Sequence, residues 1–513
     1  MMIHSLRPAL AVGTALIAAL LILFFGNRMK PNVRESITMA ASVIMAGIVF
    51  SMVPAVLSGD VYISRLWTIA GGIDLTLKTD GAGMVFACIA SSLWILTSIY
   101  SIGYMRGHHE KNQTGYFAAF AACLASAVGI ALASNLITFF IFYEMLTLAT
   151  YPLVAHYRDD KAKASGRKYL AYTLISGQLF FAAIVWVYAE QGTLEFTPGG
   201  FIEQGSMSQG LMCIMFLMMI IGGAVKSGVM PVHGWLPSAM VAPTPVSALL
   251  HAVAVVKAGA FCVLRVVCYV FGPESASWCG GATVLCWFAA ATIIMSSLIA
   301  MRQDNLKARL AFSTIGQLSY IILGISLLSV YSITGALFHM VAHAFLKITL
   351  FMCAGAIFVT AGLSEISSMK GLSQRMPITC ACFAVSSLGI AGLPLMAGFV
   401  SKFNILEGAL KAGWPLAIAV LIAAALLALT YLIPVVRIFF AKEMKNDEIS
   451  SRRCVKDAAP AMLIPLMLTA IIAVVLGFLP DAGPHLYDMA QMAGGVYKRR
   501  RRCLPCRIKR KST

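Results

Sequence analysis

The stretch that decides the fold is NLITFFIFYEMLTLATYPLVAH, from Asn135 to His156. As a helix rising 1.5 Å per residue, it is long enough to cross a hydrocarbon layer of about 30 Å. One carboxylate, Glu144, stands near its middle. Because a charge at the bilayer centre costs about 2.5–3.5 kcal/mol on insertion scales, the stretch predicts a membrane helix whose glutamate serves a function.

The composition of the whole chain agrees with this interpretation. Of 513 residues, 59% are hydrophobic and 12% are charged, and the mean hydropathy is +0.84. Soluble domains have about 25% charged residues, so an ordinary water-soluble enzyme is excluded. Membrane topology and lipid headgroups account for the net charge of +18, and we expect no nucleic-acid partner. The thirteen cysteines are scattered and give no disulfide framework or metal-binding spacing.

Apolar segments of membrane-spanning length recur along the chain. They predict an all-α polytopic membrane protein with about fourteen transmembrane helices, the first of which we interpret as a retained helix and not a signal peptide. The predicted spans are 8–25, 36–57, 80–103, 117–133, 135–155, 169–190, 210–232, 246–272, 282–301, 308–329, 332–362, 377–398, 412–441 and 458–479.

The distribution of Lys and Arg over the loops predicts the orientation. One set of alternate loops carries twenty of these residues, and the opposite set, which includes Arg265 at a span edge, carries five. The rule that cytoplasmic loops are rich in Lys and Arg places the first set in the cytoplasm and the N-terminus outside. An even count of spans also places the C-terminus outside, although the run Lys498–Lys511 contains nine bases. Either the count is wrong by one, or this late tail is translocated against the rule.

Four lysines join Glu144 inside the predicted spans: Lys226, Lys257, Lys347 and Lys402. Packing alone would favour leucine at such positions, so the set indicates proton or ion transport. Each lysine also has a purely structural interpretation. Lys402, close to a span end by hydropathy, would extend to the interface, and Lys257 would be an ion-pair partner that stabilises a helix.

Histidines form a second pattern. His339, His343 and Lys347 are spaced i, i+4, i+8, so a helix places them on one face over roughly 12 Å, as a ladder for protons. The alternative is that they hold helices together through hydrogen bonds. A zinc site would need a third ligand, and we expect no metal. His251 and Lys257 are six residues apart, about 120° round a continuous helix, so we expect them to face different neighbours.

Two of the lysines are close to helix breakers. Pro231 follows Lys226 by five residues, and Gly392, Pro394 and Gly398 precede Lys402. Breaks inside a membrane are tolerated only where protein or a wet cavity surrounds them. Interrupted spans in two parts of a chain are typical of transporters built from inverted repeats. The seventh and twelfth spans are the interrupted ones, which fits five-helix repeats.

Five segments resemble the antiporter-like membrane subunits shared by Mrp-type cation/proton antiporters, respiratory complex I and membrane-bound hydrogenases. The resemblance covers about residues 80–440, and the D subunit of Mrp antiporters is the branch that looks most similar. The segments are NLITFFIFYEMLTLATYPLVAH (135–156), AVKSGVMPVHGWLPSAMVAPTPVSALLHAVAVVKAG (224–259), MRQDNLKARLAFSTIGQLSYIILG (301–324), HMVAHAFLKITLFMCAG (339–355) and GIAGLPLMAGFVSKF (389–403).

The resemblance implies an organisation and a site. Residues 1–116 would form helices 1–3, 117–272 a first inverted repeat (helices 4–8), 273–441 a second (helices 9–13), and 442–513 the last helix with the basic tail. Helices 7 and 12 would be broken. The implied proton-carrying residues are Glu144, Lys226, Lys257, His251, His339, His343, Lys347 and Lys402.

The function expected from the resemblance is that of a proton-translocating subunit of a multisubunit Na⁺/proton antiporter in the cytoplasmic (inner) membrane. The alternative is a proton-pumping membrane subunit of a complex I-like NADH:quinone oxidoreductase or a membrane-bound hydrogenase. We expect no cofactor in this chain, because no dinucleotide fingerprint or cysteine cluster is present, so any redox chemistry would belong to partner subunits. A membrane scaffold without transport would not need the buried charges.

Overall fold

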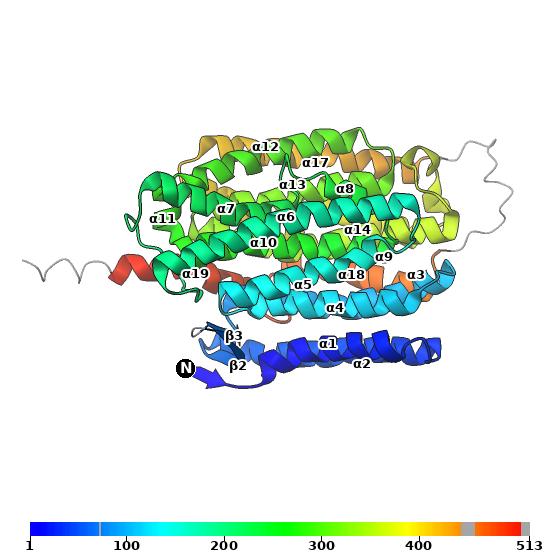
Figure 1. The fold of residues 1–513 in the computed structure, drawn as a ribbon. Helices are drawn as coiled ribbons and strands as arrows, with labels where there is room; N and C mark the ends of the chain where they lie inside the picture. Colours follow the sequence, from blue (N-terminus) through cyan, green and yellow to red (C-terminus); the bar gives the residue numbers. More distant parts are fainter. Residues whose placement is uncertain (71–72, 443–456, 504–513) are drawn as a thin grey trace, which may run out of the picture.

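The computed structural model describes residues 1–70, 73–442 and 457–503. Long helices dominate these ranges and lie roughly parallel in one bundle (Figure 1). Thirteen of the described helical segments are long and apolar enough to cross a membrane. The prediction of an all-α, multi-pass membrane protein is therefore confirmed.

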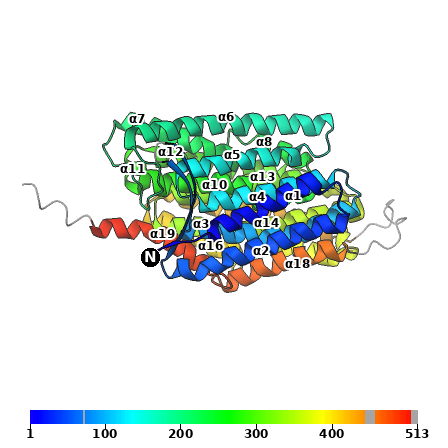
Figure 2. The same cartoon turned by 60° about the horizontal axis from the view of Figure 1, so that its bottom comes forward.

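The N-terminal part consists of two helices and a small sheet. In Figure 2, α1 and α2 come forward over α3 and α4, against which they pack. Strand β1 pairs in parallel with β2, and β2 pairs antiparallel with β3. Strands β2 and β3 lie between the second and third predicted spans, whereas β1 precedes the first. The bounds are β1 Met2–His4, α1 Arg7–Phe25, α2 Pro31–Leu57, β2 Val61–Ala70 and β3 Ile73–Lys78.

The next four helices begin at polar N-caps. The side chains of Asp80, Asn135 and Asp159 accept hydrogen bonds from backbone amides in the first turns of α3, α5 and α6. Such caps satisfy amides that would otherwise lack partners, and so fix where the helices begin. The bounds are α3 Gly81–Gly107, α4 Gln113–Leu132, α5 Leu136–Val154 and α6 Asp160–Gln191.

The seventh span is broken, as predicted. Helix α7 (Gln209–Ser227) ends at Gly228, whose φ of 73° lies in the left-handed region that glycine adopts without strain. The chain then turns through Pro231 into the short α8 (Trp235–Ser238) and η1 (Ala239–Val241). The break therefore begins three residues before the proline on which the prediction rested.

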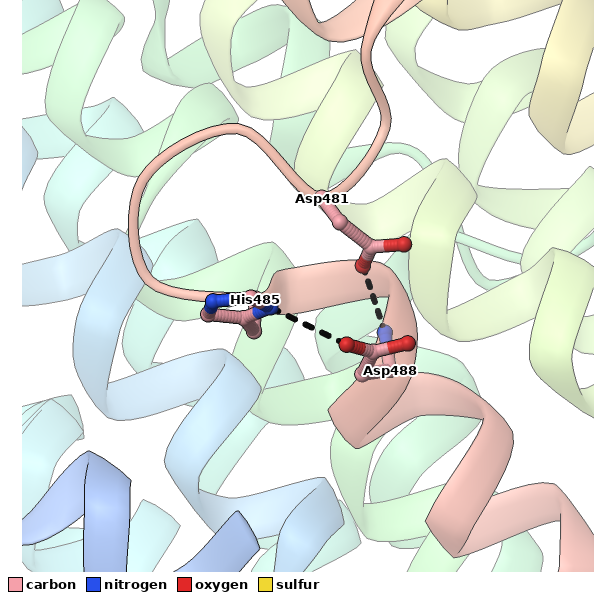
Figure 3. Close-up of side chains that lie close together, drawn as sticks. All are labelled: Asp481, His485 and Asp488. Carbon is pink, nitrogen blue, oxygen red and sulfur yellow. Dashed lines mark hydrogen bonds and ion pairs between the residues drawn. The ribbon is translucent and has the colours of Figure 1, made fainter.

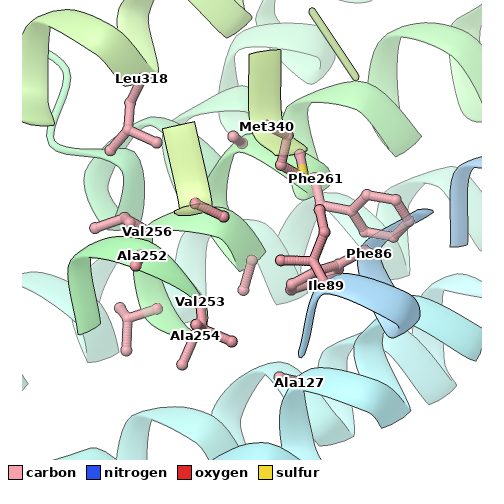
Figure 4. Close-up of a cluster of buried hydrophobic side chains, with 14 of the residues drawn as sticks. Phe86, Ile89, Ala127, Ala252, Val253, Ala254, Val256, Phe261, Leu318 and Met340 are labelled. Atoms are coloured by element: carbon pink, nitrogen blue, oxygen red, sulfur yellow. The ribbon is translucent and has the colours of Figure 1, made fainter. Parts of the chain in front are cut away.

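The eighth span differs from the single helix predicted over 246–272. It is divided into α9 (Thr244–Ala252), α10 (Val255–Arg265), the π-helical η2 (Val266–Phe271) and α11 (Gly272–Trp278). The break at Val253–Ala254 contains neither glycine nor proline. It lies in the apolar centre of the bundle, among side chains of α3, α4, α13 and α14 (Figure 4).

The remaining predicted spans are also present, and the twelfth is broken at Gly392–Met396 between α15 and α16. The central helix is α14, which packs against α3, α9, α13, α15, α16 and α18. The bounds are α12 Gly281–Met301, α13 Leu306–Ser326, α14 Val330–Ala361, η3 Ile366–Ser368, η4 Leu372–Gln374, α15 Pro377–Ala391, α16 Ala397–Lys411, α17 Pro415–Phe440 and α18 Pro460–Phe478.

The same type of contact occurs once in each of the two proposed repeats. Asn135 caps α5 and donates from its side-chain amide to Glu195, sixty residues later. Asn305 caps α13 and donates in the same way to Glu365, also sixty residues later. Helices five and ten would be equivalent in two five-helix repeats, so these contacts support the repeats, whose boundaries stay a prediction.

The last helix, α19 (Leu486–Cys503), is not a fifteenth crossing. Near its start, Tyr487 packs on Phe338 of α14 and donates to the Asn404 side chain of α16. Farther along, Gly494 lies against Val330, the first residue of α14. Helix α19 therefore runs outward along α14 and leaves the bundle at the N-terminal end (Figure 1). The thirteen long apolar segments and the broken segment α15–α16 together make the fourteen predicted spans. The side chains of Lys498–Lys511 lie outside the described residues.

Candidate functional site

Two charged side chains from α5 and α7 meet inside the first half of the bundle. Nζ of Lys226 lies 3.8 Å from Oε1 of Glu144, which is within ion-pair range and longer than a hydrogen bond. The Lys226 side chain is fully buried, and that of Glu144 is 16% exposed. Neither carboxylate oxygen has a hydrogen-bond partner among the described residues. The structure thus brings this predicted pair together in an open arrangement.

Tyr143, the residue before Glu144, holds the amine. Nζ of Lys226 donates to the Tyr143 carbonyl at 2.6 Å and lies 3.2 Å from the centroid of its ring. A buried cation over an aromatic face is worth about 2 kcal/mol. The Tyr143 hydroxyl donates to the Gly222 carbonyl of α7, which fixes the ring against the helix that carries the lysine. Sequence reasoning missed this tyrosine.

A glycine of α6 makes room for the carboxylate. At Gly177, an added Cβ would lie 2.5 Å from Oε1 of Glu144 and 3.0 Å from its Cδ. Only a residue without a side chain therefore allows Glu144 to lie against the α6 backbone. The carboxylate is held between Gly177 on one side and Lys226 on the other.

The predicted ladder on α14 is present in the middle of the bundle. His339, His343 and Lys347 are all buried, and the two imidazole rings are 6.1 Å apart. Nζ of Lys257, a residue of α10, lies 2.8 Å from Nδ1 of His343. Among the described carboxylates, none is in ion-pair range of Lys257, so its expected alternative role as an ion-pair partner is replaced by a contact with histidine.

Hydrogen bonding suggests how protons are placed on the two rings. Ser401 donates its hydroxyl proton to the Gly398 carbonyl, so its oxygen accepts from Nδ1 of His339 at 2.8 Å. A charged Lys257 donates to Nδ1 of His343, which puts the ring proton of a neutral His343 on Nε2. The Nε2 atoms of both rings have no partner within the described part of the chain. One ring then presents a donor and the other an acceptor.

Lys402 lies at the second broken helix. Its Nζ donates to the carbonyls of Ile390 and Ala391, at 2.6 and 3.2 Å, where α15 ends. It also lies 4.8 Å from the Tyr320 ring, which is 5.6 Å from the ring of His339. The amine is turned toward the helix break, so the alternative in which Lys402 extends to the membrane interface is wrong.

His251 and Lys347 occupy the other side of the ladder. The ring of His251 packs 4.8 Å from that of Phe351 on α14, and Nζ of Lys347 donates to the Leu310 carbonyl at 3.1 Å. His251 interacts electrostatically with Lys347 and His343. Because Lys257 also contacts α14, the expectation that it and His251 face different neighbours is wrong. That expectation assumed an unbroken helix.

The contacts form two groups instead of one continuous line. Lys226 interacts with Cys262 of α10, whereas Lys257 stands five residues earlier on that helix, about 7.5 Å along its axis. The ladder groups Lys257, His251, His343, Lys347 and His339, and it reaches Lys402 through Ser401 and Tyr320. Among the described residues, no hydrogen bond joins Lys226 to Lys257.

Arg265, counted from the sequence as a residue at a span edge, has a buried ion pair in the structure. Its side chain is 2% exposed and forms an ion pair with Asp80, the N-cap of α3. The rings of Phe196, Phe261 and Tyr269 lie within 5.0 Å of the guanidinium carbon. Because the partner is 185 residues away, no local pattern in the sequence shows the pair.

One described cluster has the residue types of a metal site. Asp481, His485 and Asp488 place ligand atoms within 4.8 Å of one another at the start of α19 (Figure 3). Asp481 accepts from the Asp488 amide at 2.8 Å, and Nδ1 of His485 lies 3.0 Å from Asp488. These bonds cap the helix, which is a sufficient structural role.

Residues 133–428 match the family of membrane proteins described as "NADH:quinone oxidoreductase/Mrp antiporter, TM". The match covers more than half of the chain and includes every residue of the predicted site. The chain belongs to this family. The predicted resemblance is therefore confirmed at the level of the family, while the roles of individual residues stay proposals.

Relatives come from both branches of the family. The chain is 28% identical over 462 residues to NADH-quinone oxidoreductase subunit N of Desulforudis audaxviator, covering 87% of this chain and 90% of that one. It is 31% identical over 445 residues to the A-type subunit of the Na⁺/H⁺ antiporter of Alkalihalophilus pseudofirmus, covering 81% of this chain. The alignment spans only about half, 54%, of that antiporter protein.

The fold also has a close structural relative. A chain in the Mrp complex from Dietzia sp. DQ12-45-1b superposes with a TM-score of 0.83 at 20% identity, covering 96% of this chain and 98% of that one. At this identity the likeness shows the fold. Assignment to the D-type branch stays a prediction.

Proposed function

We propose that this protein is the proton-translocating membrane subunit of a multisubunit monovalent cation/proton antiporter, with Na⁺ as the cation, in the cytoplasmic membrane. The observation that carries the proposal is the buried set of one carboxylate, four amines and three imidazoles. Transport gives these groups a reason to persist inside a membrane bundle. Relatives among Na⁺/H⁺ antiporter subunits support the choice of cation.

The Glu144–Lys226 pair is the switch in this proposal. At an effective dielectric constant of about 20, a unit charge about 6 Å away is worth roughly 2.8 kcal/mol, and one about 12 Å away roughly 1.4 kcal/mol. Moving the carboxylate from Lys226 toward Gly177 therefore changes the cost of keeping the amine protonated. Lys257, more than a turn away along α10, responds to that change of charge.

The ladder carries the proton onward. Loss of a proton from Lys257 lets Nδ1 of His343 become a donor, and the Nε2 atoms of His343 and His339 then exchange roles. Because all these groups interact, their protonation steps belong to the set and not to single residues. Lys402 completes the line at the second helix break.

Partner subunits complete the machine. Less than half of the apolar stretch of each of α1, α6 and α17 is buried in this chain. Their outer faces are therefore suited to lipid and to neighbouring membrane subunits. Any electron-transfer groups would be on those partners.

The test uses the whole complex in membrane vesicles. Glu144→Gln and Lys226→Ala should each reduce cation-driven proton movement to the vesicle background while leaving the amount of complex unchanged. The matched controls are Glu407→Gln and Lys411→Ala, since Glu407 and Lys411 form an exposed pair at 2.7 Å on α16. Full transport by either buried-pair variant would discard the proposed switch.

A redox-driven pump is the second candidate, because the chain covers 90% of the related subunit N. Purifying the complex and identifying its chains separates the two candidates. Small membrane antiporter subunits favour the antiporter, whereas iron–sulfur or hydrogenase-like chains favour the pump. Comparing Na⁺ with K⁺ gradients in the same vesicles tests the cation.

A further inference from the structure

A charged cleft opens at the end of the bundle that the Lys and Arg distribution assigns to the cytoplasm. It has a volume of about 710 Å³ between the starts of α2 and α4 and the end of α3. Its polar lining includes Lys30, Asn32, Arg106, Glu110 and Gln113.

Glu110 is the group of the cleft that faces inward. Its side chain is only 6% exposed. The Tyr157 hydroxyl donates to its Oε1 at 2.8 Å, Nδ1 of His108 lies 2.9 Å from the same oxygen, and Nε2 of His156 lies 3.8 Å from Oε2. The carboxylate therefore has contact both with the cleft and with the partly exposed hydroxyl of Tyr157.

Three hydroxyls continue from the carboxylate. Tyr157 uses its single proton on Glu110, so Tyr104, which also interacts with Tyr157, can contact that hydroxyl only as a donor. Thr244 in turn donates to the Tyr104 hydroxyl at 3.5 Å. The Tyr157 O–H therefore points at Glu110, and the Thr244 O–H points at Tyr104. Burial raises the pKa of Tyr157, which keeps its hydroxyl protonated.

Helix α9 extends the line to the ladder. Thr244, Ser247 and His251 are spaced i, i+3, i+7, so they share one helix face. The Ser247 hydroxyl oxygen and both ring nitrogens of His251 are buried and have no partner in the described part of the chain. Leaving such groups buried without hydrogen bonds is unfavourable. A transient occupant, a proton or the water that carries it, explains why they are kept.

We propose that Glu110 collects protons from the cleft and passes them along Tyr157, Tyr104, Thr244 and Ser247 to His251. The inference rests on the proposed function and names its uptake route. In one transfer, Glu110 gives its proton to the Tyr157 oxygen, each hydroxyl gives its own proton to the next oxygen, and the last proton binds a His251 nitrogen. After the transfer the new O–H groups point toward Glu110, so the hydroxyls must rotate toward His251 before the next transfer.

The test compares two adjacent tyrosines of α3 in the intact complex. Tyr104→Phe removes the middle hydroxyl of the route. Tyr100→Phe removes a hydroxyl that is equally buried and that donates to the Met352 carbonyl, outside the route. We expect proton uptake in vesicles to fall roughly tenfold or more in the first variant and to stay near the wild-type rate in the second.

Glu110→Gln keeps the shape of the side chain and removes its ability to bind a proton. We expect a loss of similar size that grows as the proton concentration on the cleft side falls, because collection then limits the rate. Glu110→Asp should restore a large part of the uptake. The groups facing this carboxylate are His108 after α3, and His156 and Tyr157 after α5, while Gln113 of α4 donates to the main-chain carbonyl of Glu110. The His108→Gln variant measures how much His108 contributes to the pH dependence of proton uptake.

The Glu144→Gln variant distinguishes a failure of the uptake route from a failure of the proposed function. If Glu144→Gln is inactive and both tyrosine variants transport equally well, the route is overturned and the switch stands. If Glu110→Gln loses activity equally at every pH and Glu110→Asp does not restore it, Glu110 is structural and the route is also overturned. An active Glu144→Gln variant would refute the proposed function itself, whatever the tyrosine variants do.

Discussion

The two broken helices hold their lysines in similar surroundings but with different partners. Lys226 and Lys402 each lie over a tyrosine ring, at 3.2 and 4.8 Å, and each donates to main-chain carbonyls. Among the described acids, only Glu144 comes within ion-pair range of either amine. Lys402 instead neighbours His339, through Ser401 and the Tyr320 ring.

This difference suggests a division of labour. A carboxylate can move between Lys226 and the space at Gly177, so the charge balance at the first lysine can be switched. Carbonyl dipoles at the end of α15 are fixed in the backbone and stabilise a cation without switching. The protonation of Lys402 would therefore follow that of its histidine neighbours.

The largest expected difference between the sites is in stability, not in transport. Both Glu144→Gln and Lys402→Gln should abolish transport. Glu144→Gln leaves a buried ammonium without its carboxylate, a change that costs up to about 3 kcal/mol when the partner is partly exposed. Lys402→Gln leaves no opposite charge behind, and its amide can still donate to the two carbonyls. The unfolding temperature of the detergent-solubilised complex should therefore drop by a few degrees more for Glu144→Gln than for Lys402→Gln.

Adding Lys226→Met to Glu144→Gln provides the control. It removes the unpaired ammonium, so the unfolding temperature should recover while transport stays at background. Equal unfolding temperatures for the two single variants would mean that the sites do not differ in the way proposed.

The tyrosine rings sharpen the comparison at a smaller scale. Tyr143→Leu should slow transport about tenfold, since a desolvated cation–π contact is worth about 1–2 kcal/mol. Tyr320→Leu should have a smaller effect, because its ring is 1.6 Å farther from the amine. Rates in vesicles measure both variants.

The corresponding phenylalanine variants are the controls, because they keep the rings. Tyr143→Phe loses only the bond to the Gly222 carbonyl, worth about 1 kcal/mol, and should retain most of the activity. If Tyr143→Leu and Tyr143→Phe are equally slow, the hydroxyl and not the ring face supports Lys226.

Most of the fold was predictable because each membrane span corresponds to a continuous stretch of apolar residues. A long apolar run needs no tertiary information, and glycine or proline marked the breaks near Lys226 and Lys402. The break at Val253–Ala254 has no such marker, since packing in the centre of the bundle imposes it. The strands between α2 and α3 were also missed, and the register of β2 against β3 shifts at two places.

The site shows the same limit. Which residues are charged inside the spans was evident, and the ladder on α14 followed from helical spacing. Their partners were not evident, because Tyr143 and Tyr320 look like ordinary apolar residues. The partner of Arg265 was missed for the same reason, since Asp80 pairs with it across 185 residues. The partners of a charge depend on contacts between helices, which spacing along one helix does not encode.

The smallest effect is expected at the space that lets Glu144 move. Gly177→Ala would put a methyl group 2.5 Å from Oε1, so the carboxylate must shift toward Lys226 and close the pair. Transport should slow a few-fold, because separating the closed pair becomes harder, and the unfolding temperature should not fall. The control is Gly166→Ala on the same helix, where the added Cβ would meet the Tyr151 ring at 2.9 Å and not the carboxylate. If both alanine variants slow transport equally, crowding between α5 and α6 is the cause. If neither does, Glu144 does not need the space at Gly177, and the difference between the two lysine sites rests on the carboxylate alone.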